Sequence, residues 1–161
     1  MGHIDESAYV APGAHIIGDV TIGAHSSVWP CAVIRGDVAP IVVGERTNIQ
    51  DGAILHGATG APVVVGDGVT IGHAAIVHGC TVLDGALVGM GSIVLNGAII
   101  GEHALVGAGS LVTERHEVRP RTLAFGRPAR EVRGLSDEEV ADLDESARLY
   151  VRLAREAQDG H

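Results

Sequence analysis

Residues 82–112 read VLDGALVGMGSIVLNGAIIGEHALVGAGSLV, and an aliphatic residue returns at every sixth position from Val82 to Val112. The same step of six runs through the preceding chain, with a break at 38–40, an excursion at 57–64 and one slip of register before Val82. The earlier members of the series are Val10, Ile16, Ile22, Val28, Ile34, Val43, Ile49, Leu55, Val65, Ile71 and Val77. A period of six fits neither an α-helix nor a simple alternating strand. It predicts an all-β solenoid in which each six residues form one short strand and a turn.

The repeat also predicts which side chains fill the interior of the solenoid. The aliphatic residue points inward, and the residue four positions later is small or β-branched, as at Ala75, Ser92 and Ala104. Glycine often follows the aliphatic residue, where we expect it to relieve the backbone at a bend. Three hexads make one triangular coil, and stacked coils bury an aliphatic column. The alternative, a β-sandwich rich in Gly and Val by chance, is disfavoured because the period persists over most of the chain.

Composition agrees with this architecture and limits the function. Aromatic residues make up 2% of the 161 residues, whereas 46% are hydrophobic and 23 are glycine, so the core is aliphatic. The net charge of −9 offers no basic patch for phosphates and argues against a nucleic-acid partner. Cys31 and Cys80 are expected to be free thiols. We see neither a signal peptide nor a membrane span, and we expect a cytoplasmic protein.

The pattern changes near Gly134. Ser136 and Glu139 form a predicted capping box, and apolar residues then recur at helical spacing, which predicts an amphipathic helix of about 20 residues. The segment before it contains two prolines and reads as an irregular crossing. We therefore expect one structural domain with a β-helix over 1–116, a connecting segment over 117–134 and a helix over 135–161. The helix is expected to pack on the solenoid or at a subunit boundary.

Three histidines flank the excursion in the repeat. His56 directly follows Leu55 and His78 directly follows Val77, one coil later, so they are expected to lie on the same face about 4.8 Å apart. Two imidazoles stacked in this way can share a metal ion. His73 lies on another face, beyond a corner, and could complete the site of a neighbouring subunit. If the triangular prisms of neighbouring subunits pack side by side, a cyclic trimer would carry three equivalent sites, each with three histidines and open coordination positions, as in a catalytic zinc site. The alternative for each histidine is an ordinary surface side chain.

Polar residues accompany the histidines on nearby coils. Arg35 and Gln50 follow inward aliphatic residues and are expected on the outer wall. Gln50 could orient a metal-bound hydroxide, with Asp51 fixing its neighbour, and Arg35 could pair with Asp37 or hold an anionic product. Asn48 and Asp37 equally fit a structural role as polar caps on turn amides.

Several segments resemble γ-class carbonic anhydrase-like proteins, in particular the compact bacterial branch of the hexapeptide-repeat superfamily. The segments are SVWPCAVIRGD (27–37), RTNIQDGAILH (46–56), VTIGHAAIVHGC (69–80), GMGSIVLNGAIIGEHALVGAGSLV (89–112) and GRPAR (126–130). The resemblance implies a left-handed parallel β-helix, a homotrimer, and a metal between subunits, usually zinc, with iron or cobalt as alternatives. It implies metal ligands at His56, His73 and His78, with His73 from the adjacent chain.

The same resemblance implies further site residues and an activity. It matches Arg35 and Asp37 to interface and bicarbonate-side residues, Gln50 and Asp51 to residues beside the metal-bound water, and Asn48 to a supporting polar position. The implied reaction is the reversible hydration of CO₂ to bicarbonate by a zinc-bound hydroxide, which would make the protein a lyase.

The chain differs from the best-characterised active members of this family at two places. Val38 stands where those proteins carry a glutamate, and the 57–62 loop lacks their proton-shuttling glutamate. Each turnover of CO₂ hydration must export a proton, so export here would use water, buffer or another group. Two other functions fit the same repeat: an acyltransferase that binds acyl-CoA between coils, and a non-catalytic trimer stabilised by metal. Three histidines at metal spacing argue against the acyltransferase, which needs a single base.

Overall fold

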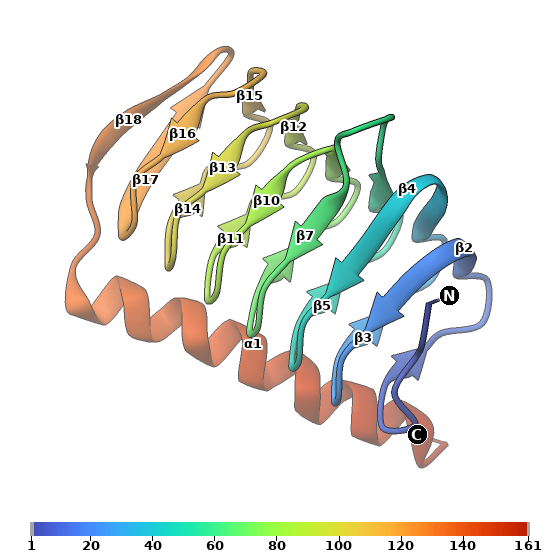
Figure 1. Cartoon of the computed structure of the whole chain (residues 1–161). Coiled ribbons are helices and arrows are strands. Elements are labelled where there is room, and N and C mark those ends of the chain that lie inside the picture. The colour runs from blue at the N-terminus through green and yellow to red at the C-terminus, as the bar shows by residue number, and fades with distance from the viewer. Residues whose placement is uncertain (1, 161) are drawn as a thin grey trace.

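The computed structural model describes residues 2–160, which form a parallel β-solenoid with one C-terminal helix (Figure 1). This confirms the predicted fold class. Strands one coil apart pair in parallel, and the solenoid has three faces. The first face consists of β1 (Tyr9–Val10), β3 (Ser27–Val28), β5 (Asn48–Ile49), β8 (Thr70–Ile71), β11 (Leu87–Val88), β14 (Leu105–Val106) and β17 (Thr122–Gly126).

Two long strands, β2 (His15–Ile22) and β4 (Val33–Val43), cross the edge between the second and third faces. The first part of β4 pairs with β6 (Ile54–His56), and its last part pairs with β7 (Val63–Val65). The second face continues through β9 (Ile76–His78), β12 (Ile93–Val94) and β15 (Leu111–Val112). The third continues through β10 (Thr81–Val82), β13 (Ile99–Ile100) and β16 (Glu117–Val118). The excursion at 57–62 therefore lies at this edge, between β6 and β7.

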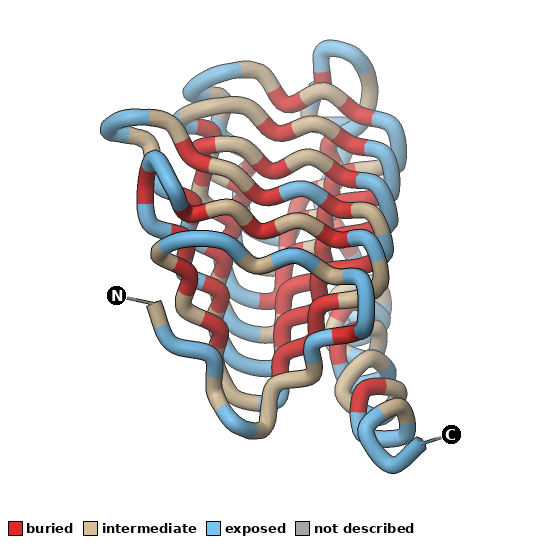
Figure 2. Tube along the Cα trace, turned by 90° about the vertical axis from the view of Figure 1, so that its right-hand side faces the viewer, coloured by how far each residue is buried: buried red, intermediate tan, exposed pale blue. Residues whose placement is uncertain are grey.

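The inward residues form the predicted aliphatic column, and buried residues recur at matching places from coil to coil in Figure 2. Every member of the series from Ile22 to Val112 is at most 1% exposed, and the small residues Ala75, Ser92 and Ala104 are fully buried. The exceptions are Val10, which is 38% exposed, and the half-buried Ile16. Both belong to the first coil, which has a neighbouring coil on one side only.

Glycine has two separate roles in the repeat. A Cβ atom at Gly72 would lie 2.6 Å from the backbone nitrogen of Met90 on the next coil, so glycine here permits close stacking of coils. Relief of a bend, which we expected of this position, is instead provided two residues later in the repeat. Gly91 lies at that turn position with a φ of +68°, in the left-handed region that favours glycine.

The solenoid extends beyond residue 116, so the expected irregular crossing at 117–134 is largely ordered strand. β16 pairs in parallel with β13, and β17 pairs in parallel with β14. β18 (Ala129–Gly134) then returns antiparallel to β17 and closes that end of the stack. Proline did not interrupt the repeat because Pro120 lies at a corner between strands, where no ladder hydrogen bond is required.

The helix α1 (Asp137–Gln158) begins at the predicted capping box, in which Ser136 and Glu139 bond each other's backbone N–H groups. It runs back along the first face toward the N-terminal coils and contacts β1, β3, β5 and β8 (Figure 1). Tyr150 packs edge-on against Trp29 at a ring distance of 5.5 Å, which anchors the helix there. Within residues 2–160, no helix is both long and apolar enough to cross a membrane.

Candidate metal centre

His56 and His78 lie directly opposite each other on the paired strands β6 and β9, as the repeat predicts. The Nδ1 atom of His56 is 3.1 Å from the Nε2 atom of His78, and the ring centroids are 5.1 Å apart. Two nitrogen ligands of a tetrahedral zinc ion, each about 2.05 Å from the metal, lie about 3.3 Å apart. The two facing nitrogens are thus spaced as neighbouring ligands of one ion.

Each of these histidines has an oxygen partner on its outer nitrogen. His56 Nε2 is 3.1 Å from Asp37 Oδ1, and His78 Nδ1 is 2.6 Å from Asn96 Oδ1. A hydrogen bond from Arg35, followed by one from His56, lowers the pKa of Asp37, so its carboxylate is an acceptor only. With the ring protons on these outer nitrogens, the inner nitrogens present lone pairs to each other. A cation between them would satisfy both.

The histidine pair does not by itself form a complete metal site. Within the described part of the chain, no cluster of three His, Cys, Asp or Glu side chains is arranged to hold a metal ion. His56 and His78 supply two ligands, and a structural or catalytic zinc requires at least one more from protein. For the pair to hold zinc, a third protein ligand would have to come from another copy of the chain or from another molecule.

His73 lies at the corner that follows β8, in the same coil as His78. His78 follows His73 by five positions of mostly extended chain, a span of roughly 15 Å, whereas two ligands of one ion lie within about 4 Å. One copy of the chain therefore cannot place His73 on the ion held by His78. Its Nδ1 atom is 3.0 Å from Asp51 Oδ2, and its side chain is 46% exposed.

Arg35 lies opposite His56 in the pairing of β4 with β6, so it continues the same row of side chains. Its guanidinium donates to Asp37 Oδ2 at 2.6 Å, and both side chains are about two-fifths exposed (42% and 41%). The fold thus joins Arg35 and Asp37 to the histidine pair, with a cationic group at the end of the row.

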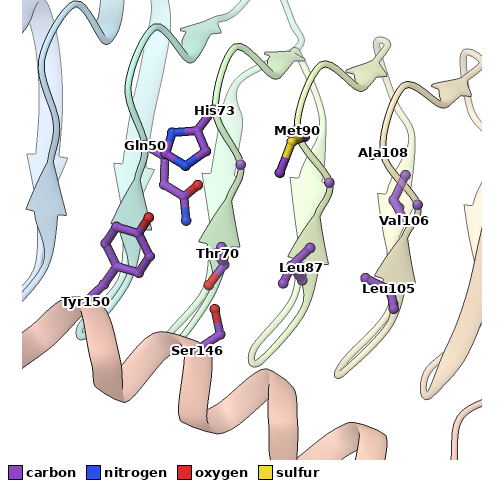
Figure 3. A pocket seen from close by; sticks show the side chains of 13 residues that line it. Gln50, Thr70, His73, Leu87, Met90, Leu105, Val106, Ala108, Ser146 and Tyr150 are labelled. Atoms are coloured by element: carbon purple, nitrogen blue, oxygen red, sulfur yellow. The ribbon is translucent and has the colours of Figure 1, made fainter.

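Gln50 points away from the solenoid core, as expected, and lines the groove beneath α1 with His73 and Tyr150 (Figure 3). Although it lies on the outer wall, it is buried, at 6% exposure, as is Asn48 at 1%. Gln50 Nε2 donates to Asn48 Oδ1 at 3.0 Å, and Asn48 Nδ2 donates to Thr70 Oγ1 at 2.9 Å. This chain of bonds fixes the orientation of the Gln50 amide.

The predicted site residues therefore fall into two groups on one chain. One group lies at the edge of the second face that borders the third and consists of Arg35, Asp37, His56 and His78. The other lies beside the corner between the first and second faces and consists of Asn48, Gln50, Asp51 and His73. The structure does not bring the groups together within one copy. The second group adjoins a groove of about 500 Å³ between α1 and the first face, with Leu87, Leu105 and Met90 along its wall (Figure 3).

Two residues near these groups were missed from the sequence. Tyr150 belongs to the apolar stripe of α1 and was assigned to packing alone, yet it lies beside Gln50 and His73 in the groove. Burial, with a smaller contribution from the charge of Asp51, raises the pKa of its hydroxyl. Asn96 had no sequence signal except its place one coil above Gly79, two residues after an inward valine.

Comparison with known proteins identifies the family. Residues 2–36 match the family described as "Bacterial transferase hexapeptide (six repeats)". The chain is 49% identical over 151 residues to the "Probable carbonic anhydrase" of Methanocaldococcus jannaschii, covering 94% of this chain and 95% of that one. It is 45% identical over 158 residues to "Gamma carbonic anhydrase 2, mitochondrial" of Arabidopsis thaliana, covering 94% and 57% of the two chains.

A solved structure of a hexapeptide transferase family protein from Anaplasma phagocytophilum superposes with a TM-score of 0.92 and 45% identity, covering 96% of this chain and 91% of that one. The fold is accordingly the left-handed parallel β-helix of hexapeptide-repeat proteins. Sequence identity at this level over nearly the whole chain establishes membership as well as fold. The protein belongs to the γ-class carbonic anhydrase-like branch of the hexapeptide-repeat family.

Proposed function

We propose that the protein is a homotrimeric metalloenzyme that catalyses the reversible hydration of CO₂ to bicarbonate. The observation that carries the proposal is the pair of inner nitrogens of His56 and His78, 3.1 Å apart and each backed by an oxygen acceptor on the opposite side of its ring. Such acceptors are the usual outer partners of metal-ligating histidines. The metal is proposed to be zinc, for which iron or cobalt could substitute.

The separation of the site residues into two groups supports a trimer. His73 from one subunit would complete the His56 and His78 pair of the next, and three-fold closure would make three identical sites. Asp51 holds His73 Nδ1, which leaves Nε2 as the ligand atom. An outward row of aliphatic side chains on the second face, near the histidine pair, supplies apolar surface for the subunit contact. The row is Val33, Ile54, Ile76, Ile93 and Leu111, paired in register from strand to strand.

The metal, when bound, would supply an acidified water for attack on CO₂. The chain's own residues would position the reactants. Gln50, with its amide held by Asn48, would hydrogen-bond the attacking oxygen or the substrate when the corner of one subunit meets the pair of another. Arg35 carries the positive charge suited to bicarbonate, and Asp37 holds both Arg35 and His56 in place.

Neither the 57–62 loop nor Val38 provides a side chain that could export the proton. The 57–62 loop is closed by a bridge between Ala58 and Ala61, turns at Gly60 with a φ of +74°, and contains no titratable side chain. Val38, beside Asp37, is 50% exposed and cannot carry a proton. We propose that bulk buffer accepts the proton, so the rate should depend on buffer concentration.

The test is metal content and stopped-flow CO₂ hydration on one sample, with and without added imidazole. About one metal ion per chain and a rate that rises with imidazole would support the enzyme. A protein that contains no metal and takes up none would refute the metal site. Metal without hydration activity would instead support a non-catalytic trimer stabilised by metal.

The groove beside His73 favours a second candidate, an acyltransferase. A long apolar cleft with a histidine at one end could hold an acyl group near a general base, and the solved relative cited above is described as a transferase family protein. Acetyl-CoA would then protect the protein against heat, whereas chelation of metal would have no effect. Loss of heat stability on chelation of metal, with no protection by acetyl-CoA, would reject the acyltransferase.

A further inference from the structure

We propose that Asn96 is a positioning residue that selects the ligand nitrogen of His78. Its side-chain carbonyl oxygen faces Nδ1 of His78 and would accept the Nδ1–H, which would keep the lone pair on Nε2, the atom that faces His56. The inference deepens the proposed metal site and rests on it for its consequence, although the hydrogen bond itself can be tested without metal.

A neutral imidazole carries one ring proton, and the acceptor beside one nitrogen decides where that proton resides. Asn96 Oδ1 lies 2.6 Å from His78 Nδ1, which is shorter than most N–H···O hydrogen bonds, at about 2.9 Å. With the opposite tautomer, His78 would point an N–H at His56 and could not bind an ion there without rearrangement. One amide oxygen therefore determines whether the pair can bind metal.

The coil below is shaped to admit this contact. Asn96 stands one coil above Gly79, with which it shares a column at the edge of the second face; Gly97 N bonds Gly79 O at 2.7 Å. A Cβ atom on residue 79 would lie 2.5 Å from Asn96 Oδ1. Gly79 thus leaves the space through which the Asn96 side chain reaches down to His78. Its φ of +57° places it in the left-handed region as well.

Asn96 differs chemically from the partners of the other two histidines. Asp37 and Asp51 are carboxylates, whereas Asn96 is a neutral amide. An amide also has a donor face, so its orientation matters here in a way that a carboxylate's does not. In Asn96→Asp both side-chain oxygens accept, so this variant keeps the acceptor. In Asn96→Leu the acceptor is lost and the volume is similar.

The first experiment measures the tautomer of His78 by ¹⁵N NMR in metal-free protein with labelled histidine. We expect protonated Nδ1 and bare Nε2 in the wild type and in Asn96→Asp, and loss of this preference in Asn96→Leu. Glu114→Leu is the matched control, since Glu114 is an exposed residue of the same column one coil further on. A wild-type His78 protonated on Nε2, or an unchanged tautomer in Asn96→Leu, would overturn the proposal.

The second experiment measures zinc affinity by competition with a chelator. Asn96→Leu should bind zinc about 10-fold to 100-fold more weakly, and Asn96→Asp and Glu114→Leu should retain the wild-type affinity or exceed it. Equal affinity in Asn96→Leu and the wild type would refute the positioning role. A wild type that binds no zinc would refute the proposed function instead, and the NMR result would still decide whether Asn96 sets the tautomer.

Discussion

Asp51 and His73 occupy the same corner position on successive coils, and the carboxylate of the first lies 3.0 Å from the ring of the second. Each follows an inward isoleucine by two residues, so the repeat itself stacks them. The contact engages Nδ1 of His73 and leaves Nε2 as the atom that a metal ion could bind. His56 and His78, one face further on, present two nitrogens that need a partner. A single chain thus carries both halves of the proposed metal site.

Mixing two inactive variants should restore activity if the halves come from different subunits. His73→Ala lacks the corner ligand and His78→Ala lacks the pair, so neither homotrimer has a complete site. In any trimer that contains both variants, one interface of the three joins an intact pair to an intact corner. Random co-assembly of equal amounts should therefore recover about one quarter of the wild-type metal content.

The control for that experiment is the mixture of His56→Ala with His78→Ala. Both lack the pair, so no combination of these subunits forms a complete site. Recovery of metal in this control, or none in the mixture of His73→Ala with His78→Ala, would contradict a site shared in the proposed way. Gel filtration of each variant would show that the trimers themselves assemble.

A titratable group placed in the 57–62 loop should speed CO₂ hydration in weak buffer. Thr59 is exposed near the tip of the loop that follows His56. Thr59→Glu would provide a proton acceptor there and should raise kcat by about tenfold or more at low buffer concentration. Thr59→Gln, which is similar in size but does not titrate, should leave kcat unchanged. In concentrated imidazole all three proteins should converge, and a Gln variant as fast as the Glu variant would count against the proton-transfer explanation.

The stacked aliphatic column should account for much of the stability of the fold. Ile100 is completely buried, so Ile100→Ala should lower the free energy of unfolding by about 2–5 kcal/mol. Leu83 is 40% exposed on the third face, and Leu83→Ala should change the free energy of unfolding by no more than about 0.5 kcal/mol. Urea unfolding at one fixed protein concentration makes the comparison, because association affects apparent stability. Similar losses in both variants would contradict an interior limited to the inward positions.

Acid should weaken the attachment of α1 before it affects the solenoid. Hydrogen bonds from Arg133, and then from the Ser136 backbone, lower the pKa of Glu139 to about 2 from its ordinary value of 4.5. The folded state therefore prefers the carboxylate. This stabilisation is complete above pH 4.5 and is lost as the pH falls from there toward 2.

Hydrogen exchange in the first turn of α1 measures this effect. Protection there should fall across that pH range in the wild type. In Glu139→Gln, which cannot ionise, protection should start lower at neutral pH and change less as the pH falls. An equal decline in both proteins would show that another group is responsible.

Several features of the protein followed from its sequence alone. A six-residue period has one simple structural solution, so the inward series, the stacking of His56 on His78 and the exclusion of His73 from their row could all be predicted. The capping box at Ser136 is likewise local in sequence and was found correctly. These features depend on spacing along the chain, which the repeat converts directly into position.

The tertiary structure decided what spacing cannot express. Asp37 and Asn96 lie against the outer nitrogens of His56 and His78, and the coils bring them there from positions with no repeat signature of their own. We propose that these contacts decide which nitrogen of each ring keeps its lone pair. Gln50 is buried because a helix about a hundred residues away in the chain lies over it, and β16 to β18 extend the stack through a segment whose prolines suggested a break. The six-residue period fixes the backbone position of each side chain. Its hydrogen-bond partners, and whether α1 covers it, depend on packing between coils and against α1.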